Sequence, residues 1–391
     1  MSASFDVSSP PASTLPDWLR TQAQRRPHAR ALRHKRLGVW RAWSWQAVAA
    51  QVEQLAAGLA RRGFVPGDLL MLVSHPRDEA LLLSLAAQWC GGVALPLDPQ
   101  LADDGLAAAL RYRAPRFVFA DDDVQLDRLL AHSQRVIDAN PRRLPAHPNP
   151  AVIDYLALAE EREGGFAPLA KPHDDAFAFL RVEAQGDLVE QRLTHATLVR
   201  EAQHLAAVEK LHANDEALAA RAFAAAAQAR YLIAPWLLTG FRLNFPESLA
   251  TRDNDRRELA PTLVAGTLET YARVSRLVDD RLPGETSLRR RLIRRAQRNR
   301  GGPLGRALTW WFVTRALREV IGFSRTHAAL VVGPSLDEET AALFSALRVD
   351  VHAWPDAGDW QRVPHEARVQ QTQPTQQTPP YTHDGQLGQP A

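Results

Sequence analysis

The chain has 391 residues, of which 46% are hydrophobic and 23% are charged, so it is long enough for two or three domains with a large core. Its formal net charge of +3 is too small to indicate nucleic-acid binding, and no RNA- or DNA-binding module is present. The single Cys90 excludes an internal disulfide and fits a reducing compartment.

No segment predicts a signal peptide or a membrane span. Residues 2–16 are polar and rich in proline, without the apolar stretch of a signal peptide. No run reaches the roughly 18 to 20 apolar residues that cross a bilayer. These features predict a cytoplasmic protein and leave peripheral attachment to a membrane open.

Alternating strands and helices predict an α/β fold in the first part of the chain. After a flexible segment at 1–13, Thr14 is a candidate N-cap for a helix over 15–26, and strands at 31–36 and 40–44 are joined at Gly38. Further helices are predicted at 45–62, 79–90, 103–113 and 124–131, and strands at 69–74, 93–97 and 116–120. This alternation is typical of parallel βαβ units and predicts a first subdomain over 14–171.

The second part has fewer clear elements. A strand is predicted at 177–182 and a helix at 194–207, followed by apolar core segments at 231–238, 242–245, 263–265 and 328–332. They predict a second α/β subdomain over 172–360. Residues 361–391 are predicted to be disordered, because glutamine, threonine and proline dominate there and apolar residues are scarce.

The most informative segment spans residues 179–195 and reads FLRVEAQGDLVEQRLTH. It resembles, in degraded form, the phosphate loop of the adenylate-forming enzymes in their long-chain acyl-CoA synthetase branch, Y-T-S-G-T-T-G-x-P-K-G-V-x-L-T-H. In this alignment the family glycine falls on Gly186 and the family lysine on Val189. The family hydroxyl positions fall on Val182, Ala184 and Gln185. The candidate cofactor-binding residues that remain are Gly186, Thr194 and His195, and the last two also fit a structural helix start.

The charge of this segment opposes nucleotide binding. A phosphate loop binds polyanions through clustered N–H groups, hydroxyls and a lysine. Here Glu183, Asp187 and Glu190 are predicted to surround the same turn and would repel a triphosphate. We therefore expect ATP to bind poorly or not at all.

The resemblance extends over most of residues 14–356. AQWCGGVALPLDP at 87–99 and the segment ending in LREVIGFSRTHAALVVG at 317–333 are similar to packing motifs of the family. They imply an α/β fold like the N-terminal domain of an adenylate-forming enzyme, with parallel sheets flanked by helices in two subdomains and without the C-terminal lid.

Positions that carry the family chemistry have changed. FAAAAQ at 223–228 stands where the family has an acyl-tunnel segment, and Leu268 and Glu269 replace a Pro-Arg pair. HAWPDAGDW at 352–360 replaces the motif with the Thr-Glu pair, and its Asp359 is not assigned a metal. No lysine follows Lys210, so a family-type lid lysine is not supplied by this sequence.

The resemblance implies a family reaction that uses ATP, magnesium and coenzyme A. Because the loop lysine, the Thr-Glu pair, the ribose aspartate and the lid lysine are missing, we predict no catalytic residue, no metal and no bound cofactor. The leading hypothesis is a catalytically inactive relative that binds fatty acid or acyl-CoA or acts in regulation. Alternatives are an active or partner-completed long-chain fatty acid–CoA ligase and a structural interaction module. No protein partner is indicated.

A basic helical insertion is predicted at 285–322. It contains eight arginines between Leu288 and Arg306 and is followed by paired tryptophans. The candidate membrane-surface residues are Arg289, Arg290, Arg291, Arg294, Arg295, Trp310 and Trp311. An amphipathic basic face beside tryptophans suits an anionic membrane surface. The alternative is a solvated arginine face on a helix that packs on the core.

Other reactive residues give no site. His28, His34, His75 and His132 are scattered without metal-ligand spacing. The acidic run at 121–123 fits a solvated loop. Cys90 has no evident histidine partner, so no nucleophile is predicted.

Overall fold

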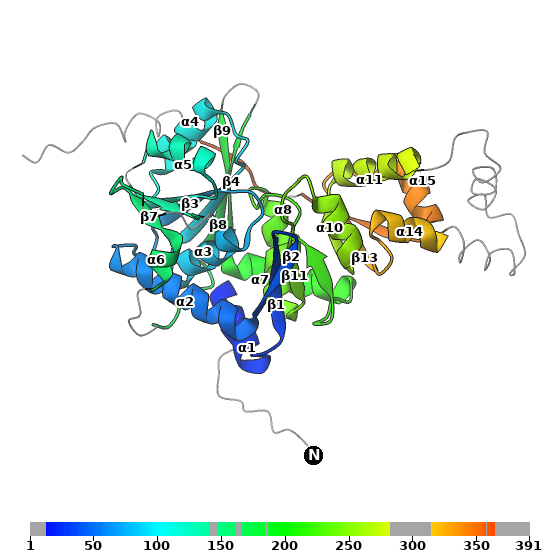
Figure 1. The fold of residues 1–391 in the computed structure, drawn as a ribbon, viewed down its shortest axis with the longest axis horizontal. Coiled ribbons are helices and arrows are strands. Elements are labelled where there is room, and N and C mark those ends of the chain that lie inside the picture. Colours follow the sequence, from blue (N-terminus) through cyan, green and yellow to red (C-terminus); the bar gives the residue numbers. More distant parts are fainter. Residues whose placement is uncertain are drawn as a thin grey trace, which may run out of the picture.

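The computed structural model contains two β-sheets with helices between them and on their outer faces (Figure 1). It describes residues 13–133, 135–140, 145, 147–160, 166–183, 187–281, 314–356 and 358–363. The predicted α/β class is confirmed. The element boundaries in the first 130 residues agree with the predicted ranges to within two residues.

The eight-stranded sheet is formed mainly by the first part of the chain. Its strands, in spatial order, are β15 (Gln361–Arg362), β9 (Leu188–Thr194), β8 (Asp175–Val182), β4 (Val93–Leu97), β3 (Leu69–Val73), β5 (Phe117–Ala120), β6 (Val136–Asp138) and β7 (Val152–Asp154). The pairs β8–β9 and β9–β15 are antiparallel, and the other pairs are parallel. Its outer face is covered by α4 (Asp103–Arg113) and α5 (Asp123–Leu130).

The seven-stranded sheet is formed mainly by the second part. Its strands, in spatial order, are β14 (Val351–Trp354), β13 (Ala328–Val332), β12 (Leu263–Gly266), β10 (Glu216–Leu218), β11 (Arg242–Phe245), β1 (Arg30–Arg36) and β2 (Val39–Ser44). Only the β1–β2 pair is antiparallel. On its outer side lie α10 (Arg252–Leu259), α11 (Leu268–Arg281), α14 (Arg315–Ile321) and α15 (Glu338–Ala346).

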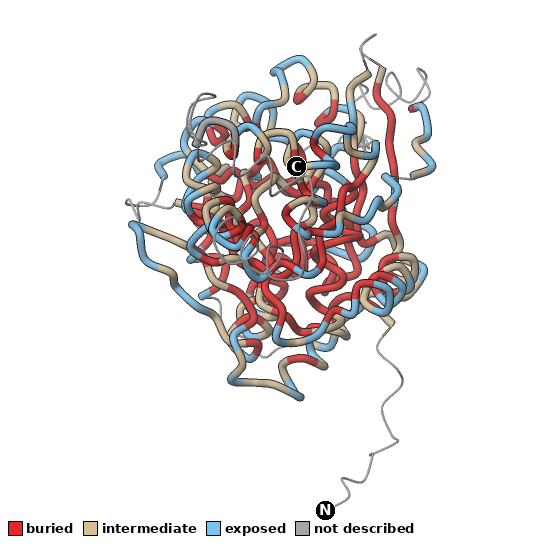
Figure 2. Tube along the Cα trace, turned by 90° about the vertical axis from the view of Figure 1, so that its right-hand side faces the viewer, coloured by how far each residue is buried: buried red, intermediate tan, exposed pale blue. Residues whose placement is uncertain are grey.

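A shared layer of helices lies between the two sheets. It consists of α1 (Leu15–Arg25), α2 (Trp45–Arg61), α3 (Asp78–Trp89), α6 (Tyr155–Glu160), α7 (His195–Val208), α8 (Ala226–Gln228), the π-helix η1 (Ala229–Ile233) and α9 (Ala234–Thr239). At its centre the rings of Trp45 and Trp236 stack with centroids 4.8 Å apart. Trp236 Nε1 also donates to the carbonyl oxygen of Ala31 at 2.9 Å, which ties α9 to β1. Figure 2 shows this interior as a continuous buried region.

The central strands are apolar at every position because both of their faces are buried. In β3, Leu69, Met71 and Val73 face the outer cluster with α4 and α5. Leu70 and Leu72 face the shared layer. Successive side chains of a strand point to opposite faces, so a strand covered on both sides has no polar alternation. The run LLMLV therefore predicts a strand covered by helices on both faces.

Neither sheet comes from one continuous stretch of chain. The hairpin β1–β2 near the N-terminus joins the seven-stranded sheet, whereas β8, β9 and β15 join the eight-stranded sheet. The predicted division between residues 171 and 172 therefore does not separate the sheets, and the subdomain boundaries remain predictions. The sheets are also mixed rather than purely parallel, because these hairpins form their edges.

The predicted disordered tail begins too early. Gln361 and Arg362 pair with Glu190 and Val189 of β9, and the N–H of Val363 donates to the carbonyl oxygen of Leu188 at 3.0 Å. An edge strand has unpaired backbone groups that can bind another segment, and these three residues fill that position. Residues 364–391, like residues 1–12, lie outside the described part of the chain.

The predicted N-cap of α1 is confirmed in detail, and α2 is followed by a glycine. The side chain of Thr14 accepts a hydrogen bond from the N–H of Asp17, and the Asp17 carboxylate accepts one from the N–H of Thr14. This reciprocal pair is a capping box at the start of α1. At the end of α2, Gly63 has a φ of +83°, a left-handed conformation that glycine adopts without strain.

Gly58, in the interior of α2, provides a test of the helix layer. Alanine normally favours a helix over glycine by about 1 kcal/mol. Here a Cβ would overlap the backbone carbonyl oxygen and side chain of Leu158 in α6. We therefore expect Gly58→Ala to lower the free energy of unfolding by about 1–3 kcal/mol in urea unfolding. The control Ala60→Ser, exposed on the same helix, should change it by less than about 0.5 kcal/mol. A more stable Gly58→Ala protein would contradict this packing.

Candidate ligand-binding site

A cavity of about 380 Å³ lies where the carboxyl ends of strands from both sheets meet. The eight-stranded sheet contributes His75, which follows β3, and residues 98–100, which follow β4. The seven-stranded sheet contributes the end of β10 and most of β12, together with α10 and α11. Ligands of open α/β sheets commonly bind in the crevice outside the carboxyl ends of the strands. This position makes the cavity the candidate site.

The lining divides into an apolar and a basic part. Its apolar residues, mostly at β10 and β12, are Leu218, Ala220, Ala222, Leu249, Leu263, Val264 and Ala265. Its basic residues are Arg221, Arg252, Arg256, Arg273 and Arg276, and its carboxylates are Asp98 and Glu269. Five arginines against two carboxylates favour an anion, and the apolar part favours a ligand that also carries a hydrophobic group.

Two of the arginines are held by a carboxylate. Asp253 pairs with both Arg256 and Arg273. Burial lowers the pKa of Arg256 to about 10, and its Nε donates to the carbonyl oxygen of Ile321 at 3.0 Å, so this side chain also joins α10 to α14. Although burial alone would raise it, the pKa of Asp253 is lowered by the hydrogen bond from Arg273 and the charge of Arg256.

Arg252 differs from its neighbours because it faces other cations. Burial lowers the pKa of its guanidinium, and the charges of Arg273 and Arg221 lower it further, while the charge of Asp253 opposes this shift in part. Among the described residues, no carboxylate forms a salt bridge with Arg252. Arg221 donates to the hydroxyl of Thr267, whose hydroxyl in turn donates to Glu269. An anion in the cavity would relieve the repulsion around Arg252.

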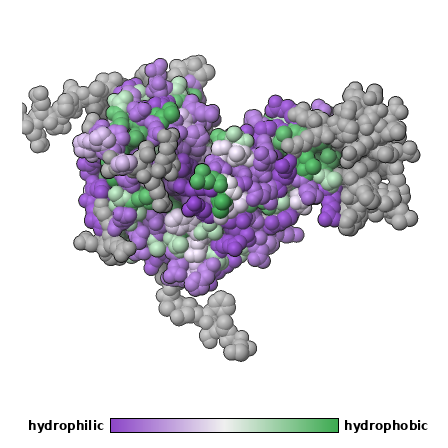
Figure 3. Space-filling model, in the orientation of Figure 1, coloured by the Kyte–Doolittle hydropathy of each residue, from purple (hydrophilic) through white to green (hydrophobic). Residues whose placement is uncertain are grey.

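A larger cavity of about 860 Å³ adjoins this one and shares His75, Gln100 and Leu249 with it. The shared His75 is half-buried, and its ring Nδ1 and backbone N lie 2.9 and 2.8 Å from the carboxylate of Asp121. The hydrogen bond to Asp121 raises the pKa of His75. In Figure 3 hydrophilic residues predominate on the face where the two parts of the molecule meet, with a small apolar group near its centre. The two cavities together offer room for an extended ligand.

The segment 179–195 forms a closed hairpin. The β8–β9 ladder runs from Asp175 opposite Thr194 to Val182 opposite Leu188. The N–H of Glu183 donates to the carbonyl oxygen of Asp187 at 2.8 Å, which leaves only residues 184–186 beyond this bond. Val189, at the aligned lysine position, is 2% exposed. The sequence interpretation did not include β9, and Gly186 lies outside the described residues.

The predicted arrangement of three carboxylates around one turn is wrong for Glu190. This residue is buried in β9, and its carboxylate pairs with Arg113 at 3.2 Å and with Arg192 at 3.1 Å. Tyr112 donates to it at 3.2 Å. Its charge is therefore balanced within the sheet. Glu183, nearer the tip, lies 3.7 Å from Arg362 of β15.

Thr194 and His195 have structural contacts at the start of α7. The Thr194 hydroxyl accepts the N–H of Thr197 at 3.2 Å, so the predicted N-cap is confirmed. His195 is fully buried, and its Nδ1 accepts the N–H of Leu15 at 3.2 Å. Burial lowers the pKa of His195 to about 4, so the ring is neutral at pH 7. This contact joins α7 to the first turn of α1. Binding of a cofactor by these residues remains a prediction.

The segment HAWPDAGDW is anchored through its own side chains. Trp354 Nε1 donates to Glu209 at 2.8 Å, and His352 Nδ1 lies 2.9 Å from the same carboxylate. The Tyr231 hydroxyl donates to the carbonyl oxygen of Pro355 at 2.6 Å. Asp359 is exposed. These contacts fix the segment on α7 and η1.

The remaining residues named from the sequence are Cys90 and the candidates for a membrane surface. Burial raises the pKa of the Cys90 thiol to about 12, and its Sγ lies 3.3 Å from the carbonyl oxygen of Ala56, so this thiol is not an activated nucleophile. The seven candidate residues of the basic insertion, from Arg289 to Trp311, lie outside the described residues. Within the described part of the chain, no helix combines the length and apolarity that a membrane crossing requires.

Comparisons with known proteins agree with this fold. Residues 19–179 match the AMP-binding enzyme family. A 2-succinylbenzoate–CoA ligase of Escherichia coli is 34% identical over 79 residues, which cover 20% of this chain and 18% of that ligase. A 2-succinylbenzoate–CoA ligase of Salmonella typhimurium is 35% identical over 74 residues, which cover 19% of this chain and 16% of that ligase. The matched stretch is thus less than a fifth of either ligase.

Solved structures match over much more of the chain. The adenylation domain of a carboxylate reductase from Mycobacterium chelonae has a TM-score of 0.69 at 16% identity and covers 89% of this chain and 58% of its own. A candidate long-chain-fatty-acid CoA ligase from Rhodopseudomonas palustris has a TM-score of 0.63 at 18% identity. The match covers 86% of this chain and 74% of that ligase. A fatty acyl-adenylate ligase from L. pneumophila has a TM-score of 0.62 at 12% identity. The match covers 86% of this chain and 53% of that ligase. The chain therefore has the N-terminal-domain fold of adenylate-forming enzymes, and its residues 19–179 are similar to the AMP-binding enzyme family.

The arginines of the cavity were missed in the sequence. Arg221 follows β10, Arg252 lies in α10, and Arg273 and Arg276 lie in α11, so no local motif joins them. The available signal was the spacing of three in Arg273 and Arg276, which places both on one face of a helix. The fold alone brings that face next to α10.

His195 predicts a dependence of stability on pH. The pKa of this residue is about 4 in the folded protein and about 6.5 when exposed in the unfolded chain. Between these values the unfolded state binds the proton, so the free energy of unfolding should fall as the pH drops from about 6.5 to about 4, by at most about 1.4 kcal/mol per pH unit. Urea unfolding at several pH values should show a smaller fall for His195→Gln, whereas the exposed control His132→Ala keeps the wild-type slope. Equal slopes in wild type and His195→Gln would contradict the assignment.

Proposed function

We propose that this protein binds an acyl-CoA or a related acyl anion and does not catalyse ATP-dependent ligation. On this proposal it is a degenerate relative of the long-chain acyl-CoA synthetases that keeps a ligand crevice and has lost the nucleotide chemistry. The observation that carries it is the closed β8–β9 hairpin, in which Val189 is buried at the aligned lysine position.

The hairpin argues against triphosphate binding in two ways. A phosphate loop needs free N–H groups and a cation near the phosphates. Here the ladder continues to Val182 and Leu188, and the N–H of Glu183 is already bonded across the turn. Glu183 also adds negative charge near the tip. Preorganised charge supplies most of the catalysis in phosphoryl and adenylyl transfer, so its loss is hard to offset.

The cavity supports retention of an acyl ligand. Its arginines can bind a carboxylate or phosphate, while the apolar ends of β10 and β12 can contact a hydrocarbon chain. Ala222 and Gln228, which flank or end the segment aligned with the family acyl tunnel, both line the cavity. Phe223 packs against Phe245 with ring centroids 6.0 Å apart and thereby fixes this segment on the sheet. Peripheral membrane attachment through the basic insertion remains part of the proposal.

We expect no fatty-acid-dependent exchange of pyrophosphate into ATP. The purified protein should give the same exchange as a sample without enzyme, with octanoate or palmitate and Mg²⁺ present, while an active acyl-CoA ligase assayed in parallel gives a clear signal. Exchange above the blank would contradict the proposal and favour an active ligase. Addition of a cell extract would test the partner-completed alternative, with extract alone as its control.

We expect octanoyl-CoA to raise the melting temperature of the protein and Mg-ATP to leave it unchanged. A ligand at 100 times its dissociation constant stabilises the folded state by about 2.7 kcal/mol. Parallel samples with coenzyme A and with octanoate identify which part of octanoyl-CoA is recognised. Stabilisation by none of the three would contradict acyl binding and favour a structural interaction module.

The substitution Arg252→Gln should weaken ligand binding without lowering the stability of the folded protein. Loss of this partly buried cation removes repulsion from Arg273 and Arg221 along with attraction to Asp253, so the unliganded protein should be about as stable as wild type. Loss of a charge-assisted hydrogen bond should weaken octanoyl-CoA binding about tenfold in calorimetry. Arg20→Gln, at an exposed position on α1, is the matched control and should bind normally. Unchanged binding by Arg252→Gln would place the ligand elsewhere.

A further inference from the structure

Three polar residues meet at the amino-end edge of the seven-stranded sheet, away from the carboxyl ends that form the cavity. Asp215 directly precedes β10, and His327 directly precedes β13. His212 lies in the connection from α7 to β10. The sequence gives no metal-binding spacing for these residues, because His212 and His327 are far apart in the chain. The strand order brings them together, since β10 and β13 both pair with β12.

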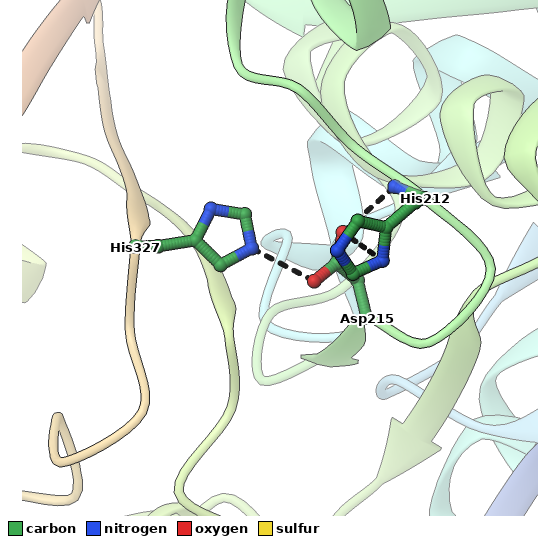
Figure 4. Close-up of side chains that lie close together, drawn as sticks. All are labelled: His212, Asp215 and His327. Carbon is green, nitrogen blue, oxygen red and sulfur yellow. Dashed lines mark hydrogen bonds and ion pairs between the residues drawn. The ribbon is translucent and has the colours of Figure 1, made fainter.

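The two imidazoles lie on either side of the Asp215 carboxylate (Figure 4). His327 Nε2 is 2.8 Å from Oδ1, and His212 Nδ1 is 3.4 Å from Oδ2. The rings are 6.0 Å apart between centroids. The side chains of His212 and His327 are 61% and 42% exposed, whereas that of Asp215 is 1% exposed. A buried anion thus sits between two accessible nitrogen donors.

Two hydrogen bonds from neighbouring groups also hold the carboxylate of Asp215 in place. The Thr262 hydroxyl donates to Oδ1 at 2.9 Å, and the backbone N–H of His212 donates to Oδ2 at 2.8 Å. Hydrogen bonds of this kind orient the carboxylate ligand in many metal sites. Among the described residues, no arginine or lysine forms an ion pair with Asp215. The charge of Asp215 is therefore not already neutralised by a permanently charged side chain.

We propose that His212, Asp215 and His327 bind a Zn²⁺ ion. One ligand atom from each residue lies within 4.8 Å of the others. Zinc bonds to histidine nitrogen and carboxylate oxygen are about 2.0–2.2 Å long, and tetrahedral geometry separates the ligand atoms by somewhat more than 3 Å. The separations of 2.8 and 3.4 Å between the histidine nitrogens and the Asp215 oxygens are close to this spacing. Water completes the coordination on the exposed side.

The ion would cross-link distant parts of the chain. It would join the start of β10 to the start of β13 and hold both against β12 between them. None of the three proposed ligands lines the arginine-lined cavity, so zinc binding does not depend on the proposed acyl ligand.

Two other histidine–carboxylate clusters fit a metal less well. In the cluster of His34, Asp78 and Glu79, both carboxylates already pair with Arg36, and all three residues are buried. In the cluster at the end of β3, Asp121 accepts two hydrogen bonds from His75, and Asp122 caps α5. These groups are occupied by contacts within the fold. The cluster at His212 has the most accessible nitrogen donors.

The test is zinc titration of the full-length protein without a histidine tag, by calorimetry and by thermal shift. We expect one ion per chain and a higher melting temperature in its presence. His212→Ala and His327→Ala should each weaken zinc binding about tenfold or more, because each removes one of three protein ligands. The exposed control His132→Ala should bind zinc as the wild type does. Visible absorption of bound Co²⁺ provides a second readout of the coordination.

Several results would overturn the proposal. They are the absence of stoichiometric zinc binding in the wild type, binding that survives both substitutions at His212 and His327, and loss of binding in a His75→Ala protein instead. Octanoyl-CoA binding measured on the same His212 and His327 variants separates a local loss of metal from a loss of fold, because the cavity does not include these residues. Failure of octanoyl-CoA binding in the wild type would leave the zinc result unaffected.

Discussion

The layer of helices shared by the two sheets is the constraint on which the structure depends. Residues from both sheets and from α1, α2, α3, α7 and α9 form one continuous buried cluster around the stacked Trp45 and Trp236. Because interiors are close-packed, neither sheet can shift without disturbing this layer. The hairpins β1–β2 and β8–β9 strengthen the connection, since each joins the sheet formed mainly by the other part of the chain. The cavity at the carboxyl ends is thereby held in shape.

Charged groups follow two different rules in this molecule. Several buried carboxylates of the framework are matched by arginines. Glu216, for example, is 2% exposed and is surrounded by Arg33, Arg242 and Arg325. In the cavity the cations outnumber the carboxylates, because Arg252 faces Arg221 and Arg273 as well as Asp253. Burying like charges together costs free energy. A local excess of cations beside an apolar wall is thus best explained by a ligand that supplies the missing negative charge.

The sequence predicts local structure well. It does not predict which side chains, distant from one another in the chain, come together in the fold. The strand LLMLV at β3 and the N-cap at Thr14 depend on neighbours in the sequence, and both predictions agree with the structure. Strands β9 and β15 were missed because polar residues such as Glu190 and Arg362 interrupt their pattern. Glu190 is tolerated in the sheet only because Arg113 and Arg192 reach it from other positions. The arginine cavity and the His212 cluster were missed for the same reason, since strand order decides which residues meet.

The hairpin at 179–195 relates stability to the proposed loss of chemistry. A loop that binds phosphate must leave N–H groups unpaired and must keep a cation exposed, and both cost stability when no ligand is bound. Here Leu188 and Val189 are buried instead, and their backbone groups pair with β8 on one side and β15 on the other. Opening the segment for a nucleotide would expose these side chains and break both ladders. Nucleotide binding at this segment would therefore require remodelling of this sheet edge, and a lysine at position 189 alone would only bury an unpaired charge.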